Sequence, residues 1–179
     1  MNKAVFLDRD GTINVDTGYI CNPDDLVFIR GSKKAVKLLK ENEYLVYVMT
    51  NQSGVGRGYF SIEKMHAVND RLAAEFEKEG IVIDGIFACP HRPDEECKCR
   101  KPKPDVVFET AEKNNVDLRK SFFVGDKDID IETGKNAGCR TVLIVGDADI
   151  IEKKEKWPKP DYVSKNLLEA VKWIIKSQK

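Results

Sequence analysis

Residues 4–12 read Ala-Val-Phe-Leu-Asp-Arg-Asp-Gly-Thr, and this stretch decides the fold prediction. The apolar run Ala4–Leu7 is short and continuous, which is typical of a parallel strand that helices cover on both faces. Two aspartates follow at once, and Gly11 permits a sharp turn behind them. The stretch therefore predicts a buried strand that leads directly into Asp8 and Asp10.

The same alternation continues along the chain. Short apolar runs predict further strands at 45–49, 86–89, 122–124 and 141–145. Amphipathic segments between them predict helices at 32–42, at 105–114, at 128–136 and at 167–176, with a longer helix that begins after an N-cap at Ser61. This order predicts an α/β fold with a doubly wound, mostly parallel sheet and helices on both faces. No repeat or composition shift divides 1–179, so we expect a single domain.

Composition excludes several classes of protein. The 30 basic and 30 acidic side chains cancel, whereas a dedicated nucleic-acid binder usually carries a basic excess. No apolar run approaches the roughly 20 residues that span a bilayer, and no charged-then-apolar leader precedes the first strand. We therefore expect a monomeric cytoplasmic protein with a small metabolite as its partner, and with no nucleic-acid or membrane partner.

Ligands of doubly wound sheets bind outside the carboxyl ends of the strands. Asp8 and Asp10 end the first strand, and the other strands are followed by a hydroxyl, a lysine and a further carboxylate, namely Thr50, Lys101 and Asp126. Two carboxylates so close together repel unless a cation lies between them or one is protonated. An isolated Asp-x-Asp-Gly would be a simple turn, but its position after a strand, together with the second aspartate after the fourth strand, favours a functional site.

This set of residues suits phosphoryl transfer. Asp8, oriented by Mg²⁺, can attack phosphorus and form an aspartyl-phosphate. Asp10 can protonate the departing alkoxide and then accept a proton from water. Thr50 and Lys101 can stabilise the charge on the phosphoryl oxygens, and Asp126 is a natural further oxygen ligand for magnesium.

Four motifs in order resemble the haloacid dehalogenase superfamily of phosphatases. They are Asp8-Arg9-Asp10-Gly11-Thr12, Thr50-Asn51, Lys101, and Gly125-Asp126 with Asp130. The resemblance implies that Asp8 is the nucleophile and Asp10 the general acid/base. It implies that magnesium is held by the Asp8 carboxylate, the Asp10 backbone carbonyl and Asp126. The chain is too short between motifs for a full cap domain, so it is similar to the capless branch.

Within that branch the chain most resembles the heptose bisphosphate phosphatases. The likeness includes Gly18-Tyr19, Thr50-Asn51-Gln52-Ser53-Gly54 and Cys99-Arg100-Lys101-Pro102. It implies removal of the C7 phosphate in activated-heptose synthesis for surface polysaccharide such as lipopolysaccharide. It also implies a set of substrate-binding residues: Asp16, Thr17, Gly18, Tyr19, Asn51, Gln52, Ser53, Arg100 and Lys127.

A cysteine and histidine cluster occupies the segment of about 89–101. Cys89, His91, Cys97 and Cys99 offer three thiolates and one imidazole, the ligand set of a structural zinc site. Unrelated buried thiols are the alternative, but one of only two histidines in the chain lies here. The metal would order a short polar loop and fix Arg100 and Lys101 behind it. The resemblance also implies zinc at this position.

Three alternatives remain open. Five residues separate His91 from Cys97, a spacing closer to that of histidinol-phosphate phosphatase. A non-catalytic zinc-containing binding module would keep the fold, although it would not need a paired nucleophile and acid. A DNA 3′-phosphatase shares the first motif, but the neutral charge balance gives that reading little support.

Overall fold

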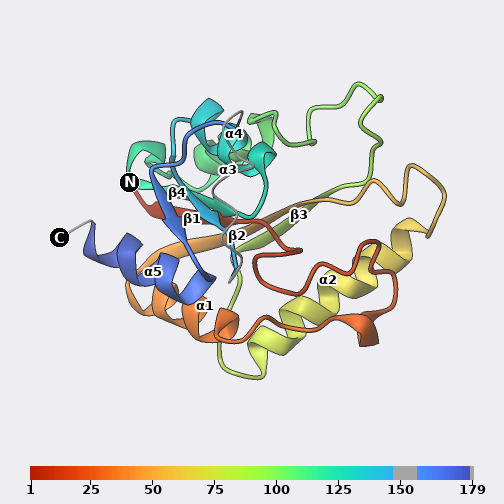
Figure 1. Ribbon diagram of the computed structural model, residues 1–179, viewed down its shortest axis with the longest axis horizontal. Helices are drawn as coiled ribbons and strands as arrows, with labels where there is room; N and C mark the ends of the chain where they lie inside the picture. The colour runs from red at the N-terminus through yellow and green to blue at the C-terminus, as the bar shows by residue number, and fades with distance from the viewer. Residues whose placement is uncertain (147–156, 178–179) are drawn as a thin grey trace.

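The computed structural model describes residues 1–146 and 157–177 of the chain, and its strands form one parallel sheet (Figure 1). The sheet order is β3-β2-β1-β4-β5-β6. In chain order the strands are β1 (Lys3–Leu7), β2 (Tyr44–Asn51), β3 (Gly85–Cys89), β4 (Phe122–Gly125), β5 (Arg140–Ile144) and β6 (Tyr162–Ser164). Every pairing between neighbouring strands is parallel. The predicted α/β class and doubly wound sheet are confirmed.

Helices cover both faces of the sheet, as Figure 1 shows: α1, α2 and α5 lie on one side, and α3 and α4 on the other. Their bounds are α1 (Ser32–Glu41), α2 (Ile62–Glu77), α3 (Asp105–Lys113), α4 (Asp128–Asn136) and α5 (Leu167–Lys176). Two short 3-10 turns, η1 (Pro23–Asp25) and η2 (Leu118–Lys120), complete the described elements. The N-cap predicted at Ser61 is confirmed, because its hydroxyl accepts a hydrogen bond from Lys64 N.

The central strand β1 explains why both sheet faces are apolar. Successive side chains of a strand point to opposite faces. Val5 and Leu7 pack in the core beneath α1, α2 and α5, whereas Ala4 and Phe6 pack on the opposite face with residues of α3. All four are fully buried. The continuous apolar run that led to the strand prediction therefore reflects burial on two sides.

Two details of the strands differ from the prediction. β6 was not predicted, because its three residues are too few to show a periodic pattern. Thr50 and Asn51 were expected to follow the second strand, but they are the last residues of β2. Their side chains are therefore held by the sheet itself rather than by a loop.

The direction in which successive strands are added to the sheet reverses between β1 and β4, which are parallel, hydrogen-bonded neighbours. Leu7 lies opposite Val124, and Asp8 N donates to the Val124 carbonyl over 2.9 Å. The chain continues from β1 toward β2 and from β4 toward β5, so a crevice forms at the carboxyl ends of β1 and β4. Asp8 and Asp126 directly follow these two strand ends.

No large cap covers this crevice among the described residues. The connection 8–31 contains only the turn η1 as a named element, and the connections 52–61 and 90–104 contain no helix or strand. In the part of the chain that the structure describes, no helix has the length and apolar character needed to cross a membrane.

Candidate active site

Lys101 lies buried between two carboxylates at the carboxyl ends of β1 and β4. Its Nζ is 2.6 Å from Asp8 Oδ1 and 2.6 Å from Asp130 Oδ1, and 6% of the residue is exposed. Burial raises the pKa of the Asp8 carboxyl to about 8, an effect that Lys101 opposes and the Asp130 carboxylate reinforces. One lysine therefore does not fully compensate the negative charge here, and a further cation would be bound favourably.

Asp126 brings a third carboxylate to the same place. Asp8, Asp126 and Asp130 each place an oxygen within 4.8 Å of the others. Among the described residues, Asp126 Oδ1 is buried with no hydrogen-bond partner, and burial raises the pKa of Asp126. Both oxygens of Asp130, by contrast, are engaged, one by Lys101 Nζ and one by the backbone N–H of Lys127. The Asp8 and Asp126 pair therefore fits a hard, oxygen-liganded cation such as Mg²⁺.

Two glycines make room for these carboxylates. A Cβ at Gly11 would collide with the Asp126 carboxylate, and a Cβ at Gly125 would collide with the Asp130 carboxylate. Gly11 also has φ +87°, in the left-handed region that other residues rarely adopt. The glycines of the first and fourth motifs are thus required by close packing at the site.

Asp10 has an environment that the sequence did not reveal. Arg9 donates to both of its oxygens, from Nε over 3.1 Å and from Nη2 over 2.9 Å. Asn14 Nδ2 donates to Oδ1 and Gln52 Nε2 to Oδ2, each over 2.8 Å. The repulsion expected between Asp8 and Asp10 is thus relieved by two separate cations, Lys101 for Asp8 and Arg9 for Asp10.

Residues at and just after the end of β2 form hydrogen bonds both to Asp10 and to the main chain of Lys101. Thr50 Oγ1 accepts a hydrogen bond from Gln52 Nε2 over 2.8 Å, so one amide contacts both Thr50 and Asp10. Asn51 exchanges two hydrogen bonds with the backbone of Lys101, with Oδ1 accepting from the N–H and Nδ2 donating to the carbonyl. Asn51 therefore fixes the main chain from which the Lys101 side chain enters the site.

An exposed loop at residues 15–19 forms part of the rim of the crevice at the carboxyl ends of β1 and β4. Asp16 Oδ2 pairs with Lys127 Nζ over 2.9 Å, and Asp16 Oδ1 accepts from Gly18 N. Tyr19 packs edge-to-face against Tyr59, with ring centroids 4.9 Å apart, and half of Tyr19 is exposed. Thr17 is exposed and Ser53 half-buried, and Arg100 donates to the His91 carbonyl over 3.1 Å. The expected substrate-binding residues thus lie at the carboxyl end of β2, where Asn51 is the last residue of the strand, and on loops that leave β1, β2, β3 and β4.

The cysteine and histidine cluster is assembled at the end of β3. The Cys89 and Cys99 sulfurs are 2.9 Å apart, and His91 Nδ1 lies 3.2 Å from Cys99 Sγ. Cys97 Sγ is 3.7 Å from Cys89 Sγ, and all four ligand atoms lie within 4.8 Å of one another. Four ligands at zinc-bond lengths of about 2.0–2.3 Å lie roughly 3.3–3.8 Å apart at the corners of a tetrahedron. The cluster therefore has the composition and the size of a tetrahedral metal site.

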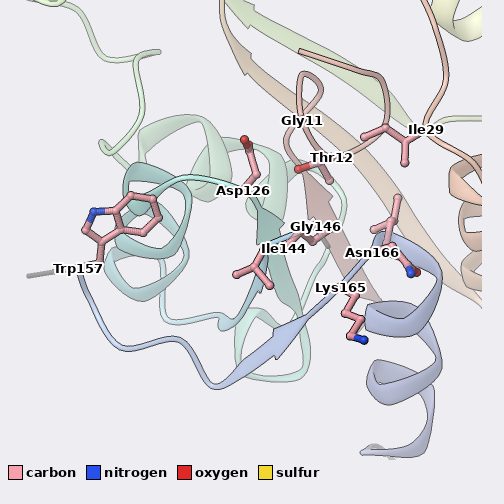
Figure 2. A pocket seen from close by; sticks show the side chains of 11 residues that line it. Gly11, Thr12, Ile29, Asp126, Ile144, Gly146, Trp157, Lys165 and Asn166 are labelled. Atoms are coloured by element: carbon pink, nitrogen blue, oxygen red, sulfur yellow. The ribbon is translucent and has the colours of Figure 1, made fainter. Parts of the chain in front are cut away.

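A cavity of about 470 Å³ adjoins the Asp126 carboxylate on the side of β5 and α5 (Figure 2). Figure 2 shows Asp126 and Thr12 close together at one end, with Lys165 and Asn166 further along the wall. Thr12 Oγ1 is buried and, like Asp126 Oδ1, has no partner among the described residues. A buried carboxylate oxygen without a hydrogen-bond partner again fits a site that takes a cation.

Comparison with known proteins agrees with this geometry. A family model described as "HAD-hyrolase-like" matches residues 98–170. The chain is 38% identical over 174 residues to the D-glycero-beta-D-manno-heptose-1,7-bisphosphate 7-phosphatase of Helicobacter pylori, covering 97% of each chain. It is 39% identical over 155 residues to the D-glycero-alpha-D-manno-heptose-1,7-bisphosphate 7-phosphatase of Burkholderia mallei, covering 83% of this chain and 82% of that protein.

A solved structure extends the likeness to three dimensions. It is the D,D-heptose 1,7-bisphosphate phosphatase of B. bronchiseptica complexed with magnesium and phosphate. The match has a TM-score of 0.89 at 32% identity and covers 98% of this chain and 99% of the other. The fold and the carboxylate-lysine centre define the class: the chain belongs to the haloacid dehalogenase superfamily. Within that class it is a member of the heptose-1,7-bisphosphate 7-phosphatase family.

Sequence reasoning missed four residues of the site. Arg9 and Asp130 belong to the first and fourth motifs, but the sequence predicts no role for either of them, nor for Asn14 or Asn69. Arg9 is nevertheless fully buried. An arginine enclosed between two aspartates at a strand end was the available signal. Nothing in the local sequence marks Asn69, which reaches the site from helix α2.

Proposed function

We propose that this chain hydrolyses the C7 phosphate of D-glycero-D-manno-heptose 1,7-bisphosphate, in the synthesis of activated heptose for surface polysaccharide. The observation that carries this is near-full-length similarity to phosphatases of that name, combined with the intact centre of Asp8, Lys101 and Asp126. A binding module without activity would not need this arrangement of buried charges, each of which is costly without a function. Relatives named for both the α and the β anomer match, so the proposal covers both.

The proposed chemistry begins at Asp8. A carboxylate oxygen of Asp8 attacks phosphorus, and the bond between phosphorus and the C7 oxygen of the sugar breaks. Asp10 gives its proton to the departing oxygen and then accepts one from the water that attacks the aspartyl-phosphate, which releases inorganic phosphate and restores Asp8. Lys101 and Thr50 donate hydrogen bonds to phosphoryl oxygens, where negative charge gathers.

Magnesium is proposed as the catalytic metal, held by the carboxylates of Asp8 and Asp126 and by the backbone carbonyl of Asp10. The unpartnered Asp126 oxygen and the raised pKa values of both aspartates support this choice. When bound, the ion would neutralise phosphoryl oxygens and orient the Asp8 carboxylate. We assign Asp130 to holding Lys101, because both of its oxygens are already occupied.

The substrate is proposed to bind across the rim loops. Asp16 to Tyr19, Thr50 to Ser53, Arg100 and Lys127 would line its pocket. Lys127 is half exposed at its side chain and paired with Asp16, so an anionic substrate can exchange with that carboxylate. We further propose that the protein acts as a monomer in the cytoplasm.

The substrate proposal is tested by kcat/KM for both anomers of heptose 1,7-bisphosphate beside histidinol phosphate, with magnesium. We expect kcat/KM for one anomer to exceed that for histidinol phosphate by at least about 100-fold. The bisphosphate carries a second phosphate, on C1, and a charged group that a site is built to bind contributes strongly to discrimination. Wild-type enzyme incubated without magnesium serves as the control. A preference for histidinol phosphate would overturn the proposal and favour the alternative suggested by the short spacing between His91 and Cys97.

A structural zinc ion is proposed at Cys89, His91, Cys97 and Cys99. Burial raises the pKa of the Cys89 thiol, so a bound cation is needed to hold that sulfur as the thiolate. The ion would order the loop that leads into Arg100 and Lys101.

Elemental analysis should find about one zinc per chain, and a zinc chelator should lower both the unfolding temperature and the activity. Cys139 is buried and is not part of the cluster, so the Cys139→Ala variant serves as the control and should bind the same amount of zinc as wild type. Metal-free protein that is folded and fully active would contradict the role.

A further inference from the structure

Arg9 is the largest fully buried side chain among the described residues, and it lies against the proposed acid/base. Its Nε and Nη2 form a fork on the two oxygens of Asp10. Asn14 and Gln52 add one donor to each oxygen, so each Asp10 oxygen accepts two hydrogen bonds. A carboxylate has about four acceptor sites. The orientation of Asp10 is therefore fully determined by its neighbours.

The guanidinium is itself anchored from a distant part of the chain. Its Nη1 donates to Asn69 Oδ1 over 2.8 Å, and Asn69 is 6% exposed. Asn69 is one of the buried residues of α2, and the other buried side chains of that helix, such as Val68 and Leu72, are apolar. An asparagine amide in an otherwise apolar stripe is costly to bury unless it is bonded. The hydrogen-bond partner of the Asn69 amide is Arg9, the residue that holds Asp10.

Stability alone does not account for this arrangement. A buried ion pair is often no more stabilising than apolar residues of similar volume, because both charges lose their water. Arg9, Asp10 and Asn69 could therefore be replaced together by apolar side chains at little expense if they served only the fold. What apolar side chains could not do is hold a carboxylate in one plane.

One of the four contacts can be released readily. Gln52 Nε2 contacts Thr50 Oγ1 and Asp10 Oδ2 at the same distance of 2.8 Å, so it keeps a partner when it leaves Asp10. Asp10 Oδ2 is thus the oxygen on the Thr50 side that can carry a proton toward substrate. The Arg9 fork remains and keeps that oxygen directed.

We propose that Arg9 and Asn69 are positioning residues that orient the Asp10 carboxylate for proton transfer to the leaving oxygen. This inference rests on the proposed role of Asp10 as the acid. It assigns to helix α2, through Asn69, a function in catalysis that does not involve contact with substrate.

Leaving-group dependence tests the inference. A sugar alkoxide needs a proton in order to leave, whereas the nitrophenolate of 4-nitrophenyl phosphate leaves without one. kcat/KM reports only the steps through formation of the aspartyl-phosphate. We expect Asn69→Leu to lower kcat/KM for heptose 1,7-bisphosphate by at least about tenfold, as part of the 10²–10⁴-fold that general acid catalysis contributes. The value for 4-nitrophenyl phosphate should stay within about twofold, and KM for the sugar should change little.

Matched variants separate positioning from packing. Asn69→Asp keeps an acceptor for Arg9 and should retain the wild-type ratio of the two kcat/KM values. Val68→Ala loosens the same helix but keeps the hydrogen bond between Asn69 and Arg9, so it should lower the unfolding temperature and leave the ratio unchanged. If Asn69→Leu does not fold, Asn69→Ala provides the same readout.

The outcomes are distinct. Equal losses on both substrates, no loss on either, or a gain on the sugar would each overturn the positioning role. Asp10→Asn measured in the same way tests the underlying proposal. If Asp10→Asn shows no selective loss on the sugar, the assigned role of Asp10 fails. If Asp10→Asn does show it and Asn69→Leu does not, only the inference about Asn69 and Arg9 fails.

Discussion

Asp8→Asn is expected to lower kcat by about 10⁴-fold or more, which is the scale of loss when a catalytic nucleophile is removed. An amide has almost the same shape as the carboxylate but does not attack phosphorus. The fold should tolerate the change, because burial raises the pKa of Asp8 and so penalises its charged form. Lys101 would keep its ion pair with Asp130. Steady-state release of inorganic phosphate measures the loss, and thermal unfolding measures the fold.

Asp25→Asn is the matched control for this variant, because Asp25 is exposed in turn η1 and distant from the strand ends in sequence. It should retain wild-type kcat. Turnover by Asp8→Asn within about tenfold of wild type would be incompatible with covalent catalysis at this residue.

Lys101→Met is the second variant for which we expect a large effect. The substitution removes the cation that lies 2.6 Å from both Asp8 and Asp130. Breaking a buried ion pair by removing one partner costs about 3–5 kcal/mol, because the remaining charge is left uncompensated. Activity should fall by at least about 10²-fold, since a fixed donor to the phosphoryl oxygens is lost as well. The loss of stability and the loss of activity both follow from removing the Lys101 ammonium group from between Asp8 and Asp130.

The pH dependence of this variant has a definite sign. The pKa of Asp8 is raised in the folded chain, from 3.8 to about 8, so the protonated form is favoured by folding. The contribution of the protonated Asp8 carboxyl to the free energy of unfolding is fully present below pH 3.8 and is lost as the pH rises toward 8. Without Lys101 the pKa of Asp8 rises further. Metal-free Lys101→Met should therefore lose more unfolding temperature relative to wild type at pH 8 than at pH 5.5.

Two comparisons complete the experiment. Lys135→Met removes an exposed lysine of α4 and should behave as wild type at both pH values. Added magnesium should restore part of the lost stability of Lys101→Met at pH 8, because the ion supplies positive charge to the same carboxylates. Unfolding temperatures equal to wild type in metal-free buffer would show that Lys101 does not compensate these charges.

The sheet and the gathering of Asp8, Lys101 and Asp126 at its edge could be predicted because both follow from short local patterns. The run at Ala4–Leu7 is apolar on two faces, and Asp8 comes directly behind it, so strand and site were visible together. Parallel strands then bring Lys101 and Asp126 to the same edge without any further information. The four ligands of the cysteine cluster were recognisable by type and spacing, and the structure brings them together.

Long-range side-chain contacts could not be predicted in this way. Asn69 occupies an ordinary position on an amphipathic helix, and only the folded chain shows that it reaches Arg9. The sequence left open whether a cation lies between Asp8 and Asp10 or one of them is protonated, and it gave no sign that Arg9, Asn14 and Gln52 hold the Asp10 carboxylate. Strand β6 was missed because three residues carry too little pattern.

The proposed activity removes one particular phosphate, that on C7, from a sugar bisphosphate. Phosphorus NMR of heptose 1,7-bisphosphate during turnover with magnesium tests it most directly. We expect the C7 phosphate signal to disappear while inorganic phosphate appears in equal amount and the C1 phosphate persists. Loss of the C1 phosphate, release of both phosphates together, or an unchanged spectrum under conditions where histidinol phosphate is hydrolysed would contradict it.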